Sequence, residues 1–358
     1  MSHRSTKNEV PEMTVGLDVS DQYIQCAFVE KSGELVEMVR ISATVAALKR
    51  RFFVQARWRI VIEVGGHSPW LSRELEALGH EVIVANARKV RAIHDNDEKN
   101  DKTDAEMLAR LGRLDPELLR PIQHRSAEAQ AVRALIKSRD QLVQTRTRLV
   151  NHIRGVVKSA GGRVPAMSPS AIHKRAQPHI PELLLPALQP LLATLALLEK
   201  QIRDYDNEVA RLAELVFPVA NQLQGARGVG PLTALTYVAT IDDPQRFKKS
   251  RSVGAYLGLV SKQSQSGDSN PQLRITKAGD PYLRSLLVQA AHYMLGPFGE
   301  DSDLRRYGLK IAAQGGKTGK KRAVIAVARK LAVLLHHLWV TGQEYEPLYL
   351  ASQQDQAA

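Results

Sequence analysis

The order of short apolar segments over residues 13–120 limits the folds available to this chain. Segments 14–20, 23–30 and 34–42 are rich in β-branched residues and follow one another with only turn residues between them, which predicts strands joined by tight turns. Helical stretches then alternate with strands: a helix over 44–56, a strand over 59–64, a helix opened by Ser68-Pro69, a strand over 81–86, and helices over about 87–94 and 103–114. The sequence therefore predicts one mixed sheet, with its later strands joined by helical crossovers.

The element order β-β-β-α-β-α-β-α is that of the ribonuclease H-like fold. Strand 59–64, RIVIEV, is mostly apolar, as is typical of a central strand covered on both faces. Pro121 closes this unit. We therefore expect an N-terminal tail over 1–12 and a ribonuclease H-like domain over 13–120.

Two long helices are predicted to follow. The first, over 126–158, is basic, and Arg139, Arg146, Arg148 and Arg154 are its candidate nucleic-acid contacts. The second carries apolar residues at alternating steps of three and four from Leu188 to Val216, the spacing of a coiled-coil seam. We interpret 121–217 as a helical linker forming a hairpin or a dimer contact; packing on its own domain is the alternative.

Pro218 begins a C-terminal region over 218–345, followed by a tail over 346–358. Gly228 and Gly230 form a turn before a helix that starts at Pro231, and such a turn presents backbone N–H groups to phosphate. This predicts a helix-hairpin-helix-like segment. Asp243, Ser250 and Asp280 mark further helix starts. Residues 314–322, QGGKTGKKR, are expected to form a flexible loop that contacts polyanions through Lys317, Lys320 and Lys321.

Charge divides the chain into two parts. Of its 358 residues, 50 are Lys or Arg and 37 are Asp or Glu, a net charge of +13. Residues 1–120 hold 18 basic and 19 acidic side chains, a net of −1, whereas the rest hold 32 and 18, a net of +14. A near-neutral front before a basic back suggests a chemical module followed by a module that holds polyanions. A generic basic cytosolic protein is the alternative.

Composition excludes other classes of protein. A hydrophobic content of 44% excludes wholesale disorder. Charged residues and histidines interrupt the longest apolar stretch, 324–340, so we expect no membrane-spanning helix. The N-terminus has no apolar signal segment, and Cys26, the single cysteine, can form neither an internal disulfide nor a cysteine-based zinc site. We expect a soluble cytoplasmic protein.

Four carboxylates stand where such a sheet would gather them. Asp18 lies in the first strand, Glu63 near the end of the inner strand, and Asp101 and Asp104 are three residues apart at a helix start. Oxygen donors from two strands and a helix suit two hard cations such as Mg²⁺ or Mn²⁺, which can clamp a phosphodiester. Singly, each acid also has a structural interpretation: Asp18 as a turn residue, and Asp104 as part of a capping box over Thr103–Glu106.

Three N-terminal segments, GLDVSDQYIQCAFVE, VIEVGGHSPWLSRELEALGHEVIVANARKVRAI and KNDKTDAEMLARL, resemble the insertion-sequence 110 transposases, a group that includes the Piv-type DNA invertases. GARGVGPLTALTYVATIDDPQRFKKSRSVGAYLGLV, SQSG and LRITKAGDPYLRSLLVQAA are similar to that family's C-terminal domain. The resemblance covers most of 13–345. It implies that Asp18, Glu63, Asp101 and Asp104 are the DEDD set of a RuvC-like domain.

The resemblance also implies a nucleophilic serine that attacks DNA and holds it as a phosphoserine. The SG pair indicates Ser266, with Ser264 and Ser269 as neighbouring rivals; from the residues alone, the loop could be a flexible linker. Arg274, Lys277 and Arg284 follow and could neutralise the phosphate or contact the DNA backbone.

The family further implies a structured bridge RNA that pairs with donor and target DNA. Only 5% of the residues are aromatic, so base stacking cannot be the main mode of grip. We expect a homo-oligomer, a dimer assembling to a tetramer, in which active-site halves come from different protomers. Two rival hypotheses are a metal-dependent junction nuclease that uses the acids and water alone, and a non-catalytic nucleic-acid-binding protein with a decayed site.

Overall fold

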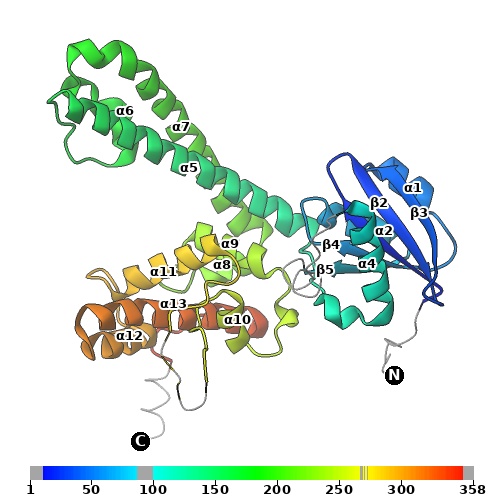
Figure 1. Ribbon diagram of the computed structural model, residues 1–358. Coiled ribbons are helices and arrows are strands. Elements are labelled where there is room, and N and C mark those ends of the chain that lie inside the picture. The colour runs from blue at the N-terminus through cyan, green and yellow to red at the C-terminus, as the bar shows by residue number, and fades with distance from the viewer. Residues whose placement is uncertain (1–10, 87–99, 267–268, 270, 272, 350–358) are drawn as a thin grey trace, which may run out of the picture. The chain divides into compact units, whose positions relative to one another are not determined.

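The computed structural model describes residues 11–86, 100–266, 269, 271 and 273–349 (Figure 1). The chain divides into two compact units, residues 1–125 and residues 126–358, called unit 1 and unit 2 below. The helix expected over about 87–94 lies outside the described residues.

Unit 1 is built on a five-stranded mixed sheet, as predicted. Its strands are β1 Met13–Val19, β2 Tyr23–Glu30, β3 Leu35–Ser42, β4 Arg59–Glu63 and β5 Glu81–Ala85. They lie in the order β3-β2-β1-β4-β5. The turn-linked strands β1, β2 and β3 pair antiparallel, whereas β1, β4 and β5 pair parallel. This topology is consistent with the ribonuclease H-like fold.

Helices cover both faces of the sheet. On one face α1 (Val45–Phe52) and α2 (Ser68–Ala77) pack on the apolar side chains of β1, β2 and β4. On the other face lies α4 (Asp101–Leu114), followed by a short 3-10 helix over Pro116–Leu119. Because alternate strand residues point to opposite faces, the two faces of β1 meet different helices.

Helix α4 packs closely on β1 and β4, and this contact depends on small residues. A Cβ at Gly16 would lie 1.9 Å from the carbonyl oxygen of Ala105, and one at Gly112 would lie 2.3 Å from the Val61 side chain. A side chain at either glycine would therefore push the helix away from the sheet. This packing fixes where the first turn of α4 lies relative to β1.

Unit 2 begins with a helical hairpin. Helix α5 (Ala127–Ser159) and α7 (Leu185–Arg211) lie side by side and extend away from the other helices of the unit (Figure 1). The short elements that connect them at the tip are 3-10 helices over Pro169–Ala171, Gln177–His179 and Glu182–Leu184, and α6 over Ile172–Arg175. Apolar side chains of both helices and the tip form a separate small core. The predicted seam therefore packs against α5 of the same chain.

The other helices of unit 2 share one larger core, which also includes the base of the hairpin. They are a π-helical turn over Leu212–Val216, α8 Pro218–Leu223, α9 Pro231–Ile241, a 3-10 helix over Pro244–Arg246, α10 Arg251–Tyr256, α11 Pro281–Leu295, α12 Asp303–Ala313 and α13 Gly316–Thr341. Helix starts at Asp243, Ser250 and Asp280 are confirmed, and the Asp243 and Asp280 side chains cap their helices.

The prediction of a flexible loop over 314–322 is wrong, because α13 begins at Gly316. Gly319 lies against the end of α12, where a Cβ would be 3.0 Å from the carbonyl oxygen of Ala312. Close packing of the two helices thus offsets the poor helix propensity of glycine.

Two helical stretches, 182–216 and 318–341, are long and apolar enough to cross a membrane by length and composition. The apolar window is 22% buried in the first stretch and 50% buried in the second. Apolar residues of α7 pack against α5, and those of α13 belong to the larger core of unit 2.

Candidate functional site

Four polar or charged side chains lie in one row across the sheet of unit 1. Asp18 of β1 is directly opposite Gln25 of β2, and Gln25 is directly opposite Arg40 of β3. On the other side of β1, Leu17 is paired with Ile62 of β4, so Glu63 occupies the position beside Asp18. Directly opposite residues share a face of the sheet. The row therefore reads Arg40, Gln25, Asp18, Glu63.

Helix α4 brings the other two acids to the same face. Gly16, two residues before Asp18, contacts the backbone of α4, so the Asp18 side chain points to the face that α4 covers. Asp101 and Asp104 lie in the first turn of this helix. The fold thus brings the four predicted acids together from two strands and one helix.

Electrostatic coupling among these acids is visible at Asp18. Burial raises the pKa of the Asp18 carboxyl, and the negative charges of Asp101, Asp104 and Glu63 raise it further. A hydrogen bond from the backbone N–H of Val19 lowers the pKa by a smaller amount. Like charges that raise a carboxyl pKa indicate that negative charge at this place is only partly neutralised by the protein. A cation at this place would relieve that repulsion.

Both structural alternatives for single acids are wrong. Asp18 is a paired residue of β1 and not part of the turn that follows. The N-cap of α4 is Asn100, whose side chain accepts a hydrogen bond from the N–H of Lys102, so Thr103 lies inside the helix and not in a capping box. Neither acid is needed for a turn or a cap at these positions.

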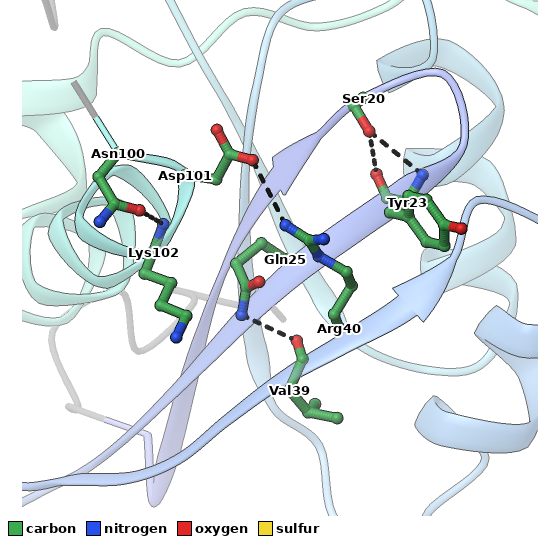
Figure 2. Close-up of polar contacts among 8 residues, drawn as sticks. All are labelled: Ser20, Tyr23, Gln25, Val39, Arg40, Asn100, Asp101 and Lys102. Atoms are coloured by element: carbon green, nitrogen blue, oxygen red, sulfur yellow. Dashed lines mark hydrogen bonds and ion pairs between the residues drawn. The ribbon is translucent and has the colours of Figure 1, made fainter.

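Asp101 has a cationic neighbour (Figure 2). The guanidinium of Arg40 lies 3.7 Å from its carboxylate, with both side chains more than half exposed. Arg40 also lies over the ring of Tyr23, 5.5 Å from the centroid. These residues line a cavity of about 240 Å³ together with Asp18, Ser20 and Gln25.

The chemistry of this donor set fits a divalent cation, because carboxylate oxygens are the ligands that hard cations prefer. In the described part of the chain, however, no three acidic, histidine or cysteine side chains are gathered closely enough to hold an ion. The four acids are neighbours that share a face and influence one another, with Asp101 turned to Arg40.

The predicted nucleophile lies in unit 2, near the tip of a narrow loop. Ser261 pairs with Ile275, and Ser266 exchanges backbone hydrogen bonds with Ser269 at 3.1 and 3.2 Å. Both Ser264 and Ser266 are exposed. Among its described residues the loop is therefore backbone-paired at two places, which distinguishes it from a structureless linker, and its serines are exposed.

The three predicted basic residues near this loop have different surroundings. Arg274 and Lys277 are exposed. Arg284 donates to the carbonyl oxygens of Leu257 and Ala278 at 3.0 and 2.7 Å and so ties the two ends of the loop together. Its contacts give Arg284 a structural role that the sequence did not indicate.

The glycine turn lies where the sequence placed it. Gly228 has a φ of +79°, the left-handed region that favours glycine, and Gly230 is the N-cap of α9. Both line a cavity of about 490 Å³, with Arg227, Gln289 and Tyr293 among its other residues. Phosphate binding there stays a prediction.

The arginines of α5 divide into internal and exposed ones. Arg139 pairs with Asp206 at 2.5 Å, and Arg146 pairs at 2.9 Å with Glu199, whose side chain is only 4% exposed. Arg154 donates to the carbonyl oxygen of Met167 in the connector. Arg148 is exposed. Three of the four predicted nucleic-acid contacts therefore hold the hairpin together.

We expect Arg146→Ala to destabilise the protein by about 3 kcal/mol, because it leaves the Glu199 carboxylate buried without its partner. Urea unfolding of unit 2 measures this loss. The control is Arg148→Ala, which removes the same charge from an exposed position and should leave the unfolding midpoint nearly unchanged. Unaltered stability in Arg146→Ala together with weaker RNA or DNA binding would assign Arg146 to the nucleic-acid surface instead.

Of the predicted lysines near the start of α13, Lys320 and Lys321 are exposed. They line a cavity of about 570 Å³ with His292 and Leu309. Lys317 lies in the first turn of the helix.

Sequence reasoning missed Arg40 and Gln25. Strand register is the signal that could have identified them. If 14–20 and 23–30 form a hairpin, the position of the turn determines that Gln25 lies opposite Asp18, and the pairing of 23–30 with 34–42 then places Arg40 opposite Gln25.

Comparison with known protein families identifies transposase segments in this sequence. Two family models match: one, of the IS110-type DEDD transposases and described as "Transposase", covers residues 15–161, and one described as "Transposase IS116/IS110/IS902 family" covers residues 220–302. The first contains all four acids, and the second contains the glycine turn and Ser266.

Individual relatives agree over nearly the whole length. The chain is 28% identical over 348 residues to a transposase for insertion sequence element IS1111A of Coxiella burnetii, covering 92% of this chain and 90% of that protein. It is 29% identical over 348 residues to a probable family 20 transposase of Pseudomonas aeruginosa, covering 93% and 98%. A pilin gene-inverting protein of Moraxella lacunata is 32% identical over 116 residues, 32% of this chain and 35% of that protein. With two acids on the sheet, two on the helix that covers it and both family segments in order, the chain belongs to the IS110 family of DEDD transposases, enzymes that cleave DNA and transfer its strands.

Proposed function

We propose that the chain is an RNA-guided DNA recombinase of an insertion element that cuts and rejoins DNA through a phosphoserine. The carboxylate face of unit 1 is the observation that carries this proposal: Glu63 of β4 and the first-turn acids of α4 lie around Asp18, and burial together with their charges raises the pKa of Asp18. Four carboxylates beside a single weakly paired arginine are costly to a fold, which favours a role in binding cations.

Asp18, Glu63, Asp101 and Asp104 are the residues that would hold Mg²⁺ or Mn²⁺. When bound, such ions neutralise charge on the phosphate and favour ionisation of the attacking hydroxyl. Placement of these acids on a sheet and on a tightly packed helix suits that task, because Gly16 lets α4 pack on β1 where any side chain would clash with the helix backbone.

Ser266 is the proposed nucleophile. Its hydroxyl oxygen loses its proton and attacks the phosphorus of one DNA strand, which forms a phosphoserine while the bond from phosphorus to the 3′ oxygen breaks and that oxygen takes up a proton. The freed 3′ hydroxyl of a second strand then loses its proton and attacks the phosphoserine, and the serine oxygen leaves and regains a proton. The exposed position of Ser266 on a paired loop suits attack on a substrate as large as DNA.

A guide RNA and an oligomer complete the proposal. The net charge of +14 over 121–358 supports a surface for RNA and DNA backbones, with base pairing supplying sequence specificity by analogy with other RNA-guided systems. Arg148, Arg274, Lys277, Lys320 and Lys321 are its exposed candidates. Exchange between two duplexes calls for at least two copies of the chain, and we propose a dimer that assembles to a tetramer.

A strand-exchange assay tests the proposal. Purified protein is mixed with RNA transcribed from the flanks of its own element, donor and target DNA, and Mg²⁺. Exchanged strands should form with RNA and metal together, and omission of either should abolish them. Exchange that proceeds without RNA would contradict guidance.

The alternative is a metal-dependent junction nuclease that uses water as the nucleophile. The acids of unit 1 favour it as much as they favour the recombinase, since both need the same cations. The two functions differ at the serine. A nuclease leaves free DNA ends and no protein–DNA adduct.

A further inference from the structure

Arg40 has no part in the proposed chemistry, yet it faces the carboxylates. It lies two strands from Asp18 in the same row of the sheet, on the face that α4 covers. It also lines the same cavity as Asp18 and Asp101. A guanidinium among acids that serve as cation ligands competes with the cation, so its presence needs an explanation.

The pair of Arg40 and Asp101 is weak and easily exchanged. Its charged atoms are 3.7 Å apart, and the two side chains are 56% and 61% exposed. Exposed pairs of this kind contribute little to stability. The contact therefore leaves Arg40 available to a stronger anionic partner that enters the cavity.

We propose that Arg40 binds the DNA phosphate at the carboxylate site and that its pair with Asp101 is the resting arrangement of the guanidinium. This inference rests on the proposed function, because it assumes that the acids bind cations and that DNA reaches them. Release of Asp101 gives the cation its ligand, and the same movement frees Arg40 for the phosphate.

The surroundings of Arg40 suit a planar anion-binding group. The guanidinium lies beside the Tyr23 ring, 5.5 Å from its centroid (Figure 2). The neighbouring Gln25 amide donates to the carbonyl oxygen of Val39 and stays on the sheet. A guanidinium held in this way can donate two hydrogen bonds to one phosphate, which an ammonium cannot do.

Two variants and one control test the inference. Arg40→Gln removes the charge, and Arg40→Lys keeps the charge but loses the planar group that donates two hydrogen bonds. Arg50→Gln removes the same charge from an exposed position on α1. Mn²⁺ is titrated into each metal-free protein without DNA, and strand cleavage is then measured at saturating metal. Thermal midpoints confirm that all variants are folded.

Opposite changes in the two measurements are expected for Arg40→Gln. Its Mn²⁺ affinity should rise about two- to fivefold, because the competing cation is gone, and its cleavage rate should fall about 100-fold. Arg40→Lys should bind Mn²⁺ like the wild type and cleave at an intermediate rate. Arg50→Gln should match the wild type within about twofold in both measurements.

Other outcomes overturn the inference. Cleavage by Arg40→Gln at the wild-type rate removes the phosphate role, and unchanged or weaker Mn²⁺ binding shows that Arg40 does not compete for Asp101. If the wild type itself neither cleaves nor exchanges DNA, the proposed function fails, while the Mn²⁺ titration still decides whether Arg40 and the cation compete.

Discussion

Replacement of Asp18 by asparagine will reduce DNA strand cleavage and exchange about a thousandfold. An amide cannot carry the negative charge that a divalent cation requires from its ligands, and Asp18 stands at the centre of the row between Gln25 and Glu63. Single-turnover cleavage of a labelled DNA at saturating metal and RNA measures the loss. The matched control is Asp21→Asn, in the turn just beyond β1, where the side chain is exposed.

The same substitution should make the metal-free protein more stable at neutral pH. Burial and the three neighbouring acids raise the pKa of Asp18 in the folded state. A raised pKa means that the contribution of Asp18 to stability is full below its ordinary range and is lost as the pH rises through the folded-state pKa. Urea unfolding at a series of pH values should therefore show the wild type falling below Asp18→Asn as the pH rises.

Normal exchange by Asp18→Asn would revive the hypothesis of a nucleic-acid-binding protein with a decayed site. Equal stability of the two proteins at every pH would mean that the four acids do not repel one another as their arrangement indicates. The two measurements are independent. Together they separate loss of metal chemistry from damage to the fold.

Ser266→Ala will abolish the covalent protein–DNA adduct. Alanine has no oxygen to attack phosphorus, so the expected loss is complete rather than partial. The substitution should leave stability unchanged, because Ser266 is exposed and its ladder contacts to Ser269 are made by the backbone. Denaturing gels of protein mixed with RNA, Mg²⁺ and end-labelled DNA show the adduct directly.

Ser264→Ala and Ser269→Ala are the matched controls, since both change a serine of the same loop. Each should form the adduct like the wild type. An adduct that persists in Ser266→Ala and vanishes in Ser264→Ala would move the nucleophile by two residues. Clean metal-dependent cutting without an adduct in the wild type would favour the junction nuclease.

Much of unit 1 could be predicted because its signals are local. Alternating and continuous apolar runs fix which segments are strands, and turns or helices between them fix their direction. The acids were found in the same way: Glu63 interrupts an apolar strand, and Asp101 and Asp104 are one helical turn apart. Burial of a charge stands out in sequence whenever its neighbours are apolar.

Long-range contacts could not be predicted in this way. Arg146 and Glu199 are 53 residues apart along the chain, and no residue near Arg146 in the sequence indicates that it pairs with a buried carboxylate. The prediction of a loop over 314–322 is wrong because it, too, considered only neighbouring residues. The glycines of this segment predict a loop, but packing of α13 on α12 overrides that local preference.

Residue type and short-range periodicity were enough to identify the acids, the order of strands and helices in unit 1, and the uneven charge of the two parts. The side chains that share a face with Asp18 could be recognised only from the folded chain. Strand register and the close contact at Gly16 place Gln25, Arg40 and the first turn of α4 around it, and both arise from pairing between segments far apart in the chain.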